Sequence, residues 1–243
     1  MILFLGDSFT WGQGLEWDVL IEKGWSKEEI NDIVPPNHHN EHLPLELNDY
    51  REKNRWPRLV SEHFDIGYDL GRYTNGGSNA QLYKIINNLE DTTLPDNLKL
   101  IILQFTHSGR HTPLTPENVD NIFEDDIDIA SRTIKRLKEN LPFVKIVTLS
   151  WLPEIGKLME DKMGEKYVVK FNSDNKTSYG FEDLAKTYNI YNQHGVKDYH
   201  FTKEGNQIVA RNVIEHIEKH NILHKNDFYE TKGIKKSKNN LDN

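Results

Sequence analysis

The chain contains 243 residues, of which 36% are hydrophobic and 28% charged, and this suits one large globular domain with its own core. The formal net charge of −8 argues against general binding to the nucleic-acid backbone, and no stretch reaches the ~18 consecutive apolar residues that a transmembrane helix requires. The absence of cysteine excludes disulfides, thiolate metal sites and a cysteine nucleophile.

The first predicted element is a strand over residues 1–5, Met-Ile-Leu-Phe-Leu, which ends at Gly6-Asp7-Ser8. An uninterrupted apolar run bounded by glycine is typical of a parallel strand buried on both faces. Open α/β sheets bind ligands at the carboxyl ends of such strands, so Ser8 is a candidate nucleophile. Gly-Asp-Ser is also a common turn that ends in an N-cap serine. Because the strand begins at Met1 with no leader ahead of it, we expect a cytoplasmic protein.

A short helical turn is predicted over residues 9–14, because two glycines interrupt any longer helix. Residues 15–53 are polar and lack helical periodicity, which predicts a long irregular insertion over the active-site edge of the sheet. This segment contains a cluster of metal-ligating residue types, namely His38, His39, Glu41 and His42. A single flexible segment without ligands from distant parts of the chain is a poor metal site, so we predict no metal there.

A covering helix and a glycine turn follow the insertion. Apolar residues at helical spacing predict a helix from residue 54 to 64 with Pro57 in its first turn, and an extended segment is expected over residues 66–70. Gly76-Gly77-Ser78-Asn79 then precedes a second helix. Glycine lets the backbone approach a ligand closely, and N–H groups that open a helix bind negative charge, so this turn suits a developing oxyanion.

The clearest interior strand spans residues 98–105 and leads into Thr106-His107-Ser108-Gly109-Arg110. The side chains of Thr106 and His107 can donate hydrogen bonds at the strand end. Arg110 is either a ligand for an anionic or carbonyl-bearing substrate group or an exposed loop residue. A helix over 115–141 and a strand over 143–151 are expected next, and the weak pattern of residues 154–180 predicts a second substrate-facing insertion.

Asp198 and His200 directly precede a closing helix that is predicted over residues 202–220, after a short helix over 181–188. His194 is an alternative to His200, although its neighbour Gly195 favours a loop role. His216 and His220 lie four residues apart on the closing helix. Without a third ligand nearby, we expect them on a surface face rather than in a metal site.

The alternation of strands and helices predicts an α/β fold, a three-layer α/β/α doubly wound parallel sheet of about five strands with flavodoxin-like architecture. Residues 1–222 are expected to form a single domain that includes the insertion at about 15–53. Residues 223–243 contain paired lysines and asparagines with little periodicity, and predict a mobile charged tail.

Gly6-Asp7-Ser8 after the first strand, together with Asp198-Tyr199-His200 before the last helix, resembles the first and last signature blocks of the SGNH (GDSL-type) hydrolases. The resemblance extends over most of residues 1–220 and implies Ser8 as nucleophile, His200 as base and Asp198 as the triad acid, with no cofactor or metal. The family commonly has Asp-x-x-His, one residue longer than here. Residues two apart in an extended segment lie ~6.6 Å apart on the same side, so the pairing is feasible.

The family's second block is a glycine whose backbone N–H joins that of the nucleophile in the oxyanion hole. Gly76 resembles this glycine, with Gly77 as the alternative. The third block, Gly-x-Asn-Asp, supplies a further oxyanion donor. This chain has no asparagine there, which leaves Thr106 and His107 as substitutes. Loss of one oxyanion donor costs about 10²–10³ in turnover in another serine hydrolase, so the departure affects rate more than reaction type.

The resulting hypothesis is a serine esterase that hydrolyses a carboxylic ester, with an acetyl ester as one version, through an acyl-Ser8 intermediate. The expected substrate is a small-molecule or glycan ester, with no cofactor, no nucleic-acid partner and no membrane span, and the expected state is a monomer or homodimer. The alternative is a catalytically weak or inactive binding or structural module with the same fold, which the missing third-block asparagine motivates.

Overall fold

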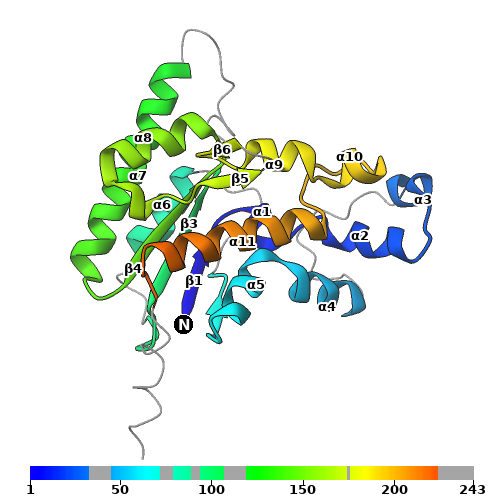
Figure 1. The fold of residues 1–243 in the computed structure, drawn as a ribbon, viewed down its shortest axis with the longest axis horizontal. Helices are drawn as coiled ribbons and strands as arrows, with labels where there is room; N and C mark the ends of the chain where they lie inside the picture. The colour runs from blue at the N-terminus through cyan, green and yellow to red at the C-terminus, as the bar shows by residue number, and fades with distance from the viewer. Residues whose placement is uncertain (33–44, 72–78, 89–93, 107–118, 174–175, 224–243) are drawn as a thin grey trace, which may run out of the picture.

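A parallel β-sheet lies at the centre of the molecule in the computed structural model, which describes residues 1–32, 45–71, 79–88, 94–106, 119–173 and 176–223. Within these residues the sheet has four strands in the order β2-β1-β3-β4 (Figure 1). The strands are β1 (Ile2–Leu5), β2 (Tyr68–Asp69), β3 (Leu100–Phe105) and β4 (Lys145–Ser150). The chain passes from β1 to a neighbour on one side and then to one on the other, so the strand order reverses at β1. Doubly wound sheets bind ligands outside the carboxyl ends of strands at such a reversal.

Helices cover both faces of the sheet, because successive side chains of each strand point to opposite faces. Ile2 and Phe4 of β1 belong to a core that also includes residues of three helices, α5 (Trp56–His63), α9 (Glu182–Thr187) and α11 (Lys203–Lys219). Leu3 and Leu5 belong to a second core with residues of α6 (Asn79–Asn88), α7 (Val119–Asn140) and α8 (Pro153–Met163). The three-layer α/β/α arrangement predicted from the sequence is therefore confirmed.

The sheet is one strand smaller than the predicted number of about five, as far as the described residues show. Beyond β4, a single parallel bridge joins Thr148 to Val168, and the N–H of Val169 donates to the carbonyl of Thr148 at 3.0 Å. The chain does not continue this pairing into a strand, because it turns at Phe171–Ser173 into a separate antiparallel pair.

The closing helix α11 begins where its sequence signals indicate. The side chain of Thr202 accepts a hydrogen bond from the N–H of Gly205 at 3.2 Å, which caps the helix. Val209, Val213 and Ile217 then form a buried stripe at helical spacing against the sheet. The cap fixes the first turn of α11 just after His200, at the site edge of the sheet.

The prediction of an irregular insertion over residues 15–53 is wrong for the part that the structure describes. Three helices lie there, α2 (Leu15–Glu22), α3 (Lys27–Asp32) and α4 (Leu45–Asn54). They form a third core with α10 (Ile190–His194), made of Trp17, Val19, Leu20, Ile30, Leu47, Ile190 and Val196. α3 and α4 carry few apolar residues, which weakens their periodicity, and such helices gain their stability from packing against neighbouring helices. The histidine cluster at 38–42 lies outside the described residues.

Residues 154–180, whose weak pattern predicted a second substrate-facing insertion, form regular elements in the structure. They contain α8, a 3₁₀ turn η2 (Glu165–Tyr167) and a small antiparallel pair, β5 (Phe171–Ser173) and β6 (Lys176–Ser178). Strands of three residues are too short for an alternating pattern to be recognised in sequence. The remaining short element is α1 (Ser8–Trp11), the turn that follows β1. None of the described helices has the length and apolar character needed to cross a bilayer.

Candidate active site

Ser8 is the first residue of α1, immediately beyond the carboxyl end of β1. The sequence allowed Ser8 to be a helix cap, but the cap is Asp7, whose carboxylate accepts from the N–H of Phe9 at 3.0 Å. The Ser8 hydroxyl is therefore available to another partner, and its Oγ lies 2.7 Å from Nε2 of His200. These two residues are 192 positions apart in the chain. Ser8 follows β1, and His200 lies just before α11.

Asp198 lies on the far side of the imidazole. Its Oδ1 is 2.8 Å from Nδ1 of His200 and also accepts from the backbone N–H of His200 at 2.7 Å. An ionised carboxylate only accepts, so Nδ1 carries the proton and Nε2 is left as the acceptor for the Ser8 hydroxyl. The short Asp-x-His spacing is thus compatible with a hydrogen-bonded chain from Asp198 through His200 to Ser8.

The Asp198 carboxylate is buried, with a side chain that is 4% exposed, while the His200 side chain is 18% exposed. Burial raises the pKa of Asp198, but the charge of His200 and the hydrogen bonds from His200 and Trp17 outweigh burial and hold the pKa below its ordinary value. Asp198 is therefore an anion at neutral pH.

His194, the alternative to His200, contacts a different carboxylate. Its Nε2 lies 3.2 Å from Oδ1 of Asp18, and the other oxygen of Asp18 accepts from the N–H of Lys203 at 2.6 Å. His194 thereby links α10 to α2 and to the start of α11. The hydrogen bond to Ser8 belongs to His200.

The imidazole of His200 packs against a cluster of aromatic side chains. The ring of Phe9 lies 4.7 Å from the ring of His200, and it also contacts Trp151 and Phe201 at 4.8 and 5.0 Å between ring centroids. Ser8 itself is 1% exposed. The hydroxyl and the imidazole therefore meet in surroundings of low polarity, where electrostatic interactions are stronger than in water.

Thr106 follows β3 directly, as predicted, but its hydroxyl has another partner. The hydroxyl donates to Oδ2 of Asp7 at 2.6 Å, and the side chain of Gln104 donates to Oδ1 at 2.7 Å. The backbone N–H of Thr106 donates to the side chain of Asn79 at 2.9 Å. A hydroxyl has one proton to donate. In this structure the proton of the Thr106 hydroxyl is directed at Asp7, and the role of Thr106 as an oxyanion donor stays a prediction.

Three further predicted residues, Gly76, His107 and Arg110, lie outside the described residues. Their proposed roles at the oxyanion or the substrate stay predictions.

Sequence reasoning missed two residues that contact this site. The indole Nε1 of Trp17 donates to Oδ2 of Asp198 at 2.9 Å, and the buried Glu16 accepts from the N–H of Gly14 at 3.1 Å. Burial raises the pKa of Glu16, against the opposing charge of Arg51. The available signal was a tryptophan and a glutamate within three residues of Gly14.

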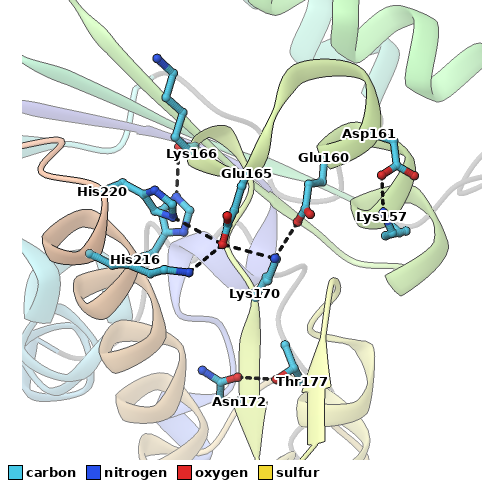
Figure 2. Close-up of polar contacts among 11 residues, drawn as sticks. Lys157, Glu160, Asp161, Glu165, Lys166, Lys170, Asn172, Thr177, His216 and His220 are labelled. Carbon is cyan, nitrogen blue, oxygen red and sulfur yellow. Dashed lines mark hydrogen bonds and ion pairs between the residues drawn. The ribbon is translucent and has the colours of Figure 1, made fainter.

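The histidine pair on α11 is not a surface feature, contrary to expectation. His216 is buried, and its Nε2 donates to the carbonyl of Lys166 at 3.1 Å (Figure 2). Glu165 lies beside the pair and contacts Lys219 at 2.6 Å. Burial lowers the pKa of His216 to about 4. Among the described residues, no three histidine, aspartate or glutamate side chains are grouped to hold a metal ion.

A pocket of about 750 Å³ lies beside β2 and α5, and its lining includes the half-exposed Trp11. Four of its charged side chains form two ion pairs. Arg55 bonds to Glu52, and Arg58 bonds to Glu62 at 2.7 Å. Neither Ser8 nor His200 lines this pocket.

Comparison with known proteins gives a fold but no sequence relative. No protein-family model matches the sequence, and no curated protein matches it. Among solved structures, a carbohydrate esterase whose active site displays divergent catalytic and non-catalytic binding functions matches over 90% of this chain, with a TM-score of 0.51 and 15% identity. The chain has an SGNH-type hydrolase fold.

Two further matches to this SGNH fold are more distant in structure. An acetyl xylan esterase from the rumen bacterium Butyrivibrio proteoclasticus matches over 92% of this chain with a TM-score of 0.49 and 10% identity. A lipolytic protein of the G-D-S-L family from Desulfitobacterium hafniense matches over 88% with a TM-score of 0.45 and 14% identity. The chain spans 64% of the length of the carbohydrate esterase and of the acetyl xylan esterase, and 98% of the length of the lipolytic protein.

Proposed function

We propose that the protein is a serine esterase that hydrolyses a carboxylic ester through an acyl-Ser8 intermediate. The observation that carries the proposal is the hydrogen-bonded chain from Asp198 through His200 to Ser8, with distances of 2.8 and 2.7 Å. An unassisted serine hydroxyl is a weak nucleophile at neutral pH and needs an adjacent base, and here a neutral Nε2 faces it.

In the first half of the reaction, His200 takes the proton of Ser8 while Oγ attacks the ester carbonyl and forms a tetrahedral intermediate. The protonated His200 then gives its proton to the leaving alcohol, and the C–O bond of the ester breaks. Asp198 holds the imidazole in the required tautomer and stabilises its positive charge. The steps use these three side chains and need no metal or organic cofactor.

In the second half, His200 removes a proton from a water molecule that attacks the acyl-Ser8 ester, and the carboxylic acid leaves as Ser8 regains its proton. The oxyanion of both tetrahedral intermediates is assigned to the backbone N–H groups of Ser8 and Gly76. This assignment for Gly76 comes from the sequence resemblance, as do the substrate contacts proposed for His107 and Arg110.

For the substrate we propose a small-molecule or glycan ester, with acetate as the acyl group. The support is the likeness in fold to a carbohydrate esterase. A small acyl group also suits a nucleophile that is 1% exposed and whose partner His200 packs against the Phe9 ring.

The test is hydrolysis of 4-nitrophenyl acetate, combined with labelling by a fluorophosphonate that reacts with activated serines. The wild type is expected to turn over the ester and to be labelled at Ser8. Ser8→Ala is expected to lose about 10⁶-fold in kcat and all labelling, because the nucleophile and its base act as a unit. Ser61→Ala, which removes a buried serine of α5, is the matched control and should retain both signals.

A second candidate function is a binding module that keeps the fold without efficient catalysis. It is favoured by one observation, the engagement of the Thr106 hydroxyl with Asp7 at the place of the missing asparagine. A folded wild type that shows neither turnover nor labelling across a panel of acetyl, butyryl and thioester substrates would support the module and contradict the esterase.

A further inference from the structure

We infer that Trp17 is a positioning residue for the reaction: its indole holds the Asp198 carboxylate in the orientation that faces His200. The inference rests on the proposed function of Ser8, His200 and Asp198. Trp17 touches neither the substrate nor the reacting atoms in this assignment, and it acts through Asp198.

The two oxygens of Asp198 have separate partners. Oδ1 accepts the two hydrogen bonds from His200, and Oδ2 accepts the indole N–H of Trp17 at 2.9 Å. A partial rotation of the carboxylate about its Cβ–Cγ bond would move both oxygens away from these donors. A buried carboxylate oxygen that loses its donor is costly, so the indole opposes the rotation. It thereby keeps one carboxylate oxygen opposite Nδ1 of the imidazole.

Trp17 is itself held rigidly, which a positioning role requires. The side chain is 5% exposed and packs in the third core with Ile190 and Val196. Its backbone N–H donates to the carbonyl of Gly14 at 2.9 Å, at the start of α2. The indole therefore approaches Asp198 from a helix that is packed on α4 and α10, rather than from a free loop.

The segment from Gly14 to Trp17 also contacts the imidazole side of the pair. Gly14 has φ +96°, and a Cβ atom at this position would lie 2.9 Å from Cβ of His200 and 3.4 Å from Oδ1 of Asp198. Only glycine adopts this conformation readily and leaves this space. Glu16 fixes the close approach, because its carboxyl accepts from the N–H of Gly14 at 3.1 Å. One short segment thus supports both Asp198 and His200.

Two charged or titratable neighbours act on Asp198 besides the indole. His200 faces Oδ1 from the segment just before α11, and Glu16 on α2 lies close enough that the charge of Asp198 raises the pKa of Glu16. Burial raises the pKa of Glu16 in turn, which favours its neutral form and limits repulsion between the two carboxyl groups. A neutral indole donor suits this place because it stabilises the Asp198 anion without competing with His200 for an ion pair.

The first experiment compares Trp17→Phe with the wild type in ester hydrolysis, with active sites counted by fluorophosphonate labelling. Phe keeps the aromatic packing and removes the donor. Because the lost bond is made to a charged group, we expect kcat per active site to fall about 10- to 100-fold, with KM changed less than twofold. The pKa of Asp198 should rise, so activity should fall off at a higher pH on the acid side of the profile than in the wild type.

Trp56→Phe is the matched control. Trp56 is a buried indole that donates to the carbonyl of Phe9 at 3.2 Å and makes no bond to Asp198. A purely structural role for Trp17 predicts that both variants lose thermal stability and that neither changes its pH profile per active site. That result would overturn the inference.

A second measurement is independent of turnover and of the folding of the variants. In wild-type protein, the indole N–H resonance of Trp17 should shift when the Asp198 carboxylate is protonated at low pH, and its proton should exchange slowly. An indole signal that ignores this titration would overturn the inference even in an active esterase. Failure of the esterase proposal is seen separately, as an absence of turnover and of Ser8 labelling in the wild type.

Discussion

Two buried aspartates lie near Ser8, and they accept hydrogen bonds from different kinds of donor. Asp7 accepts from the backbone of Phe9 and from the side chains of Gln104 and Thr106, all of them on elements fixed by the sheet. Asp198 accepts from His200 and Trp17. These three donors to Asp7 are neutral amide and hydroxyl groups. One donor to Asp198 is instead an imidazole, which can accept a further proton at Nε2. The comparison supports the proposal that Asp198 acts on the base, whereas Asp7 holds the turn that presents Ser8.

The largest expected effect in this comparison comes from Asp198→Asn. The amide keeps the shape of the side chain but places an N–H₂ or a neutral oxygen against Nδ1, which favours the wrong tautomer of His200. We expect kcat to fall about 10⁴-fold while the protein stays folded, by analogy with the same change in another serine hydrolase. Circular dichroism and the esterase assay together measure this. A loss below about tenfold would remove Asp198 from the triad.

A buried histidine far from Ser8 sharpens the comparison by showing what a structural imidazole does. The pKa of His216 is lowered to about 4 from 6.5, so the unfolded chain binds a proton in this interval that the folded chain does not. The free energy of unfolding should therefore be highest above pH 6.5 and should decrease by up to roughly 3 kcal/mol as the pH falls toward 4.

The matched variant is His216→Gln, whose amide still donates to the carbonyl of Lys166 but does not titrate. Urea unfolding measured between pH 4 and 7 should show a smaller pH dependence for the variant than for the wild type. Equal slopes for the two proteins would contradict the assignment of this pH dependence to His216.

The smallest expected effect comes from Asp7→Asn. The carboxamide oxygen can keep the bonds from Phe9 and Gln104, and the Thr106 hydroxyl can rotate to accept from the amide. We expect a loss of about 1–3 kcal/mol in the free energy of unfolding, because bonds to a charged acceptor become bonds to a neutral one. The loss in kcat per active site should be at least a hundred times smaller than that of Asp198→Asn. Comparable losses in kcat for the two variants would break the distinction between the two aspartates.

The local elements that define the site were largely predictable. The apolar run before Gly6 predicted β1, the stripe of Val209, Val213 and Ile217 predicted α11, and both predictions are confirmed. Each signal is local, because a strand buried on both faces and a helix packed on one face leave distinct patterns in the sequence. The three-layer order followed from the alternation of such segments.

The helices of residues 15–32 and 45–54 were not predictable in the same way. Arg51 of α4 and Glu16 of α2 are buried charged residues, and each interrupts the apolar face on which a helix prediction depends. These helices are stable because they pack on α10 and on one another. Their identity as helices is decided by contacts between segments more than 130 residues apart, such as Trp17 with Ile190 in the third core.

By itself, the sequence determined where a hydroxyl, an imidazole and a carboxylate follow or precede regular elements, because the hydrophobic pattern that ends a strand or begins a helix is written locally. Only the tertiary structure decided which partner each group has: Trp17 for Asp198, and Asp7 for the hydroxyl of Thr106. A hydrogen bond depends on distances within a few tenths of an ångström between groups that may be far apart in the chain, and no spacing in the sequence encodes such a distance.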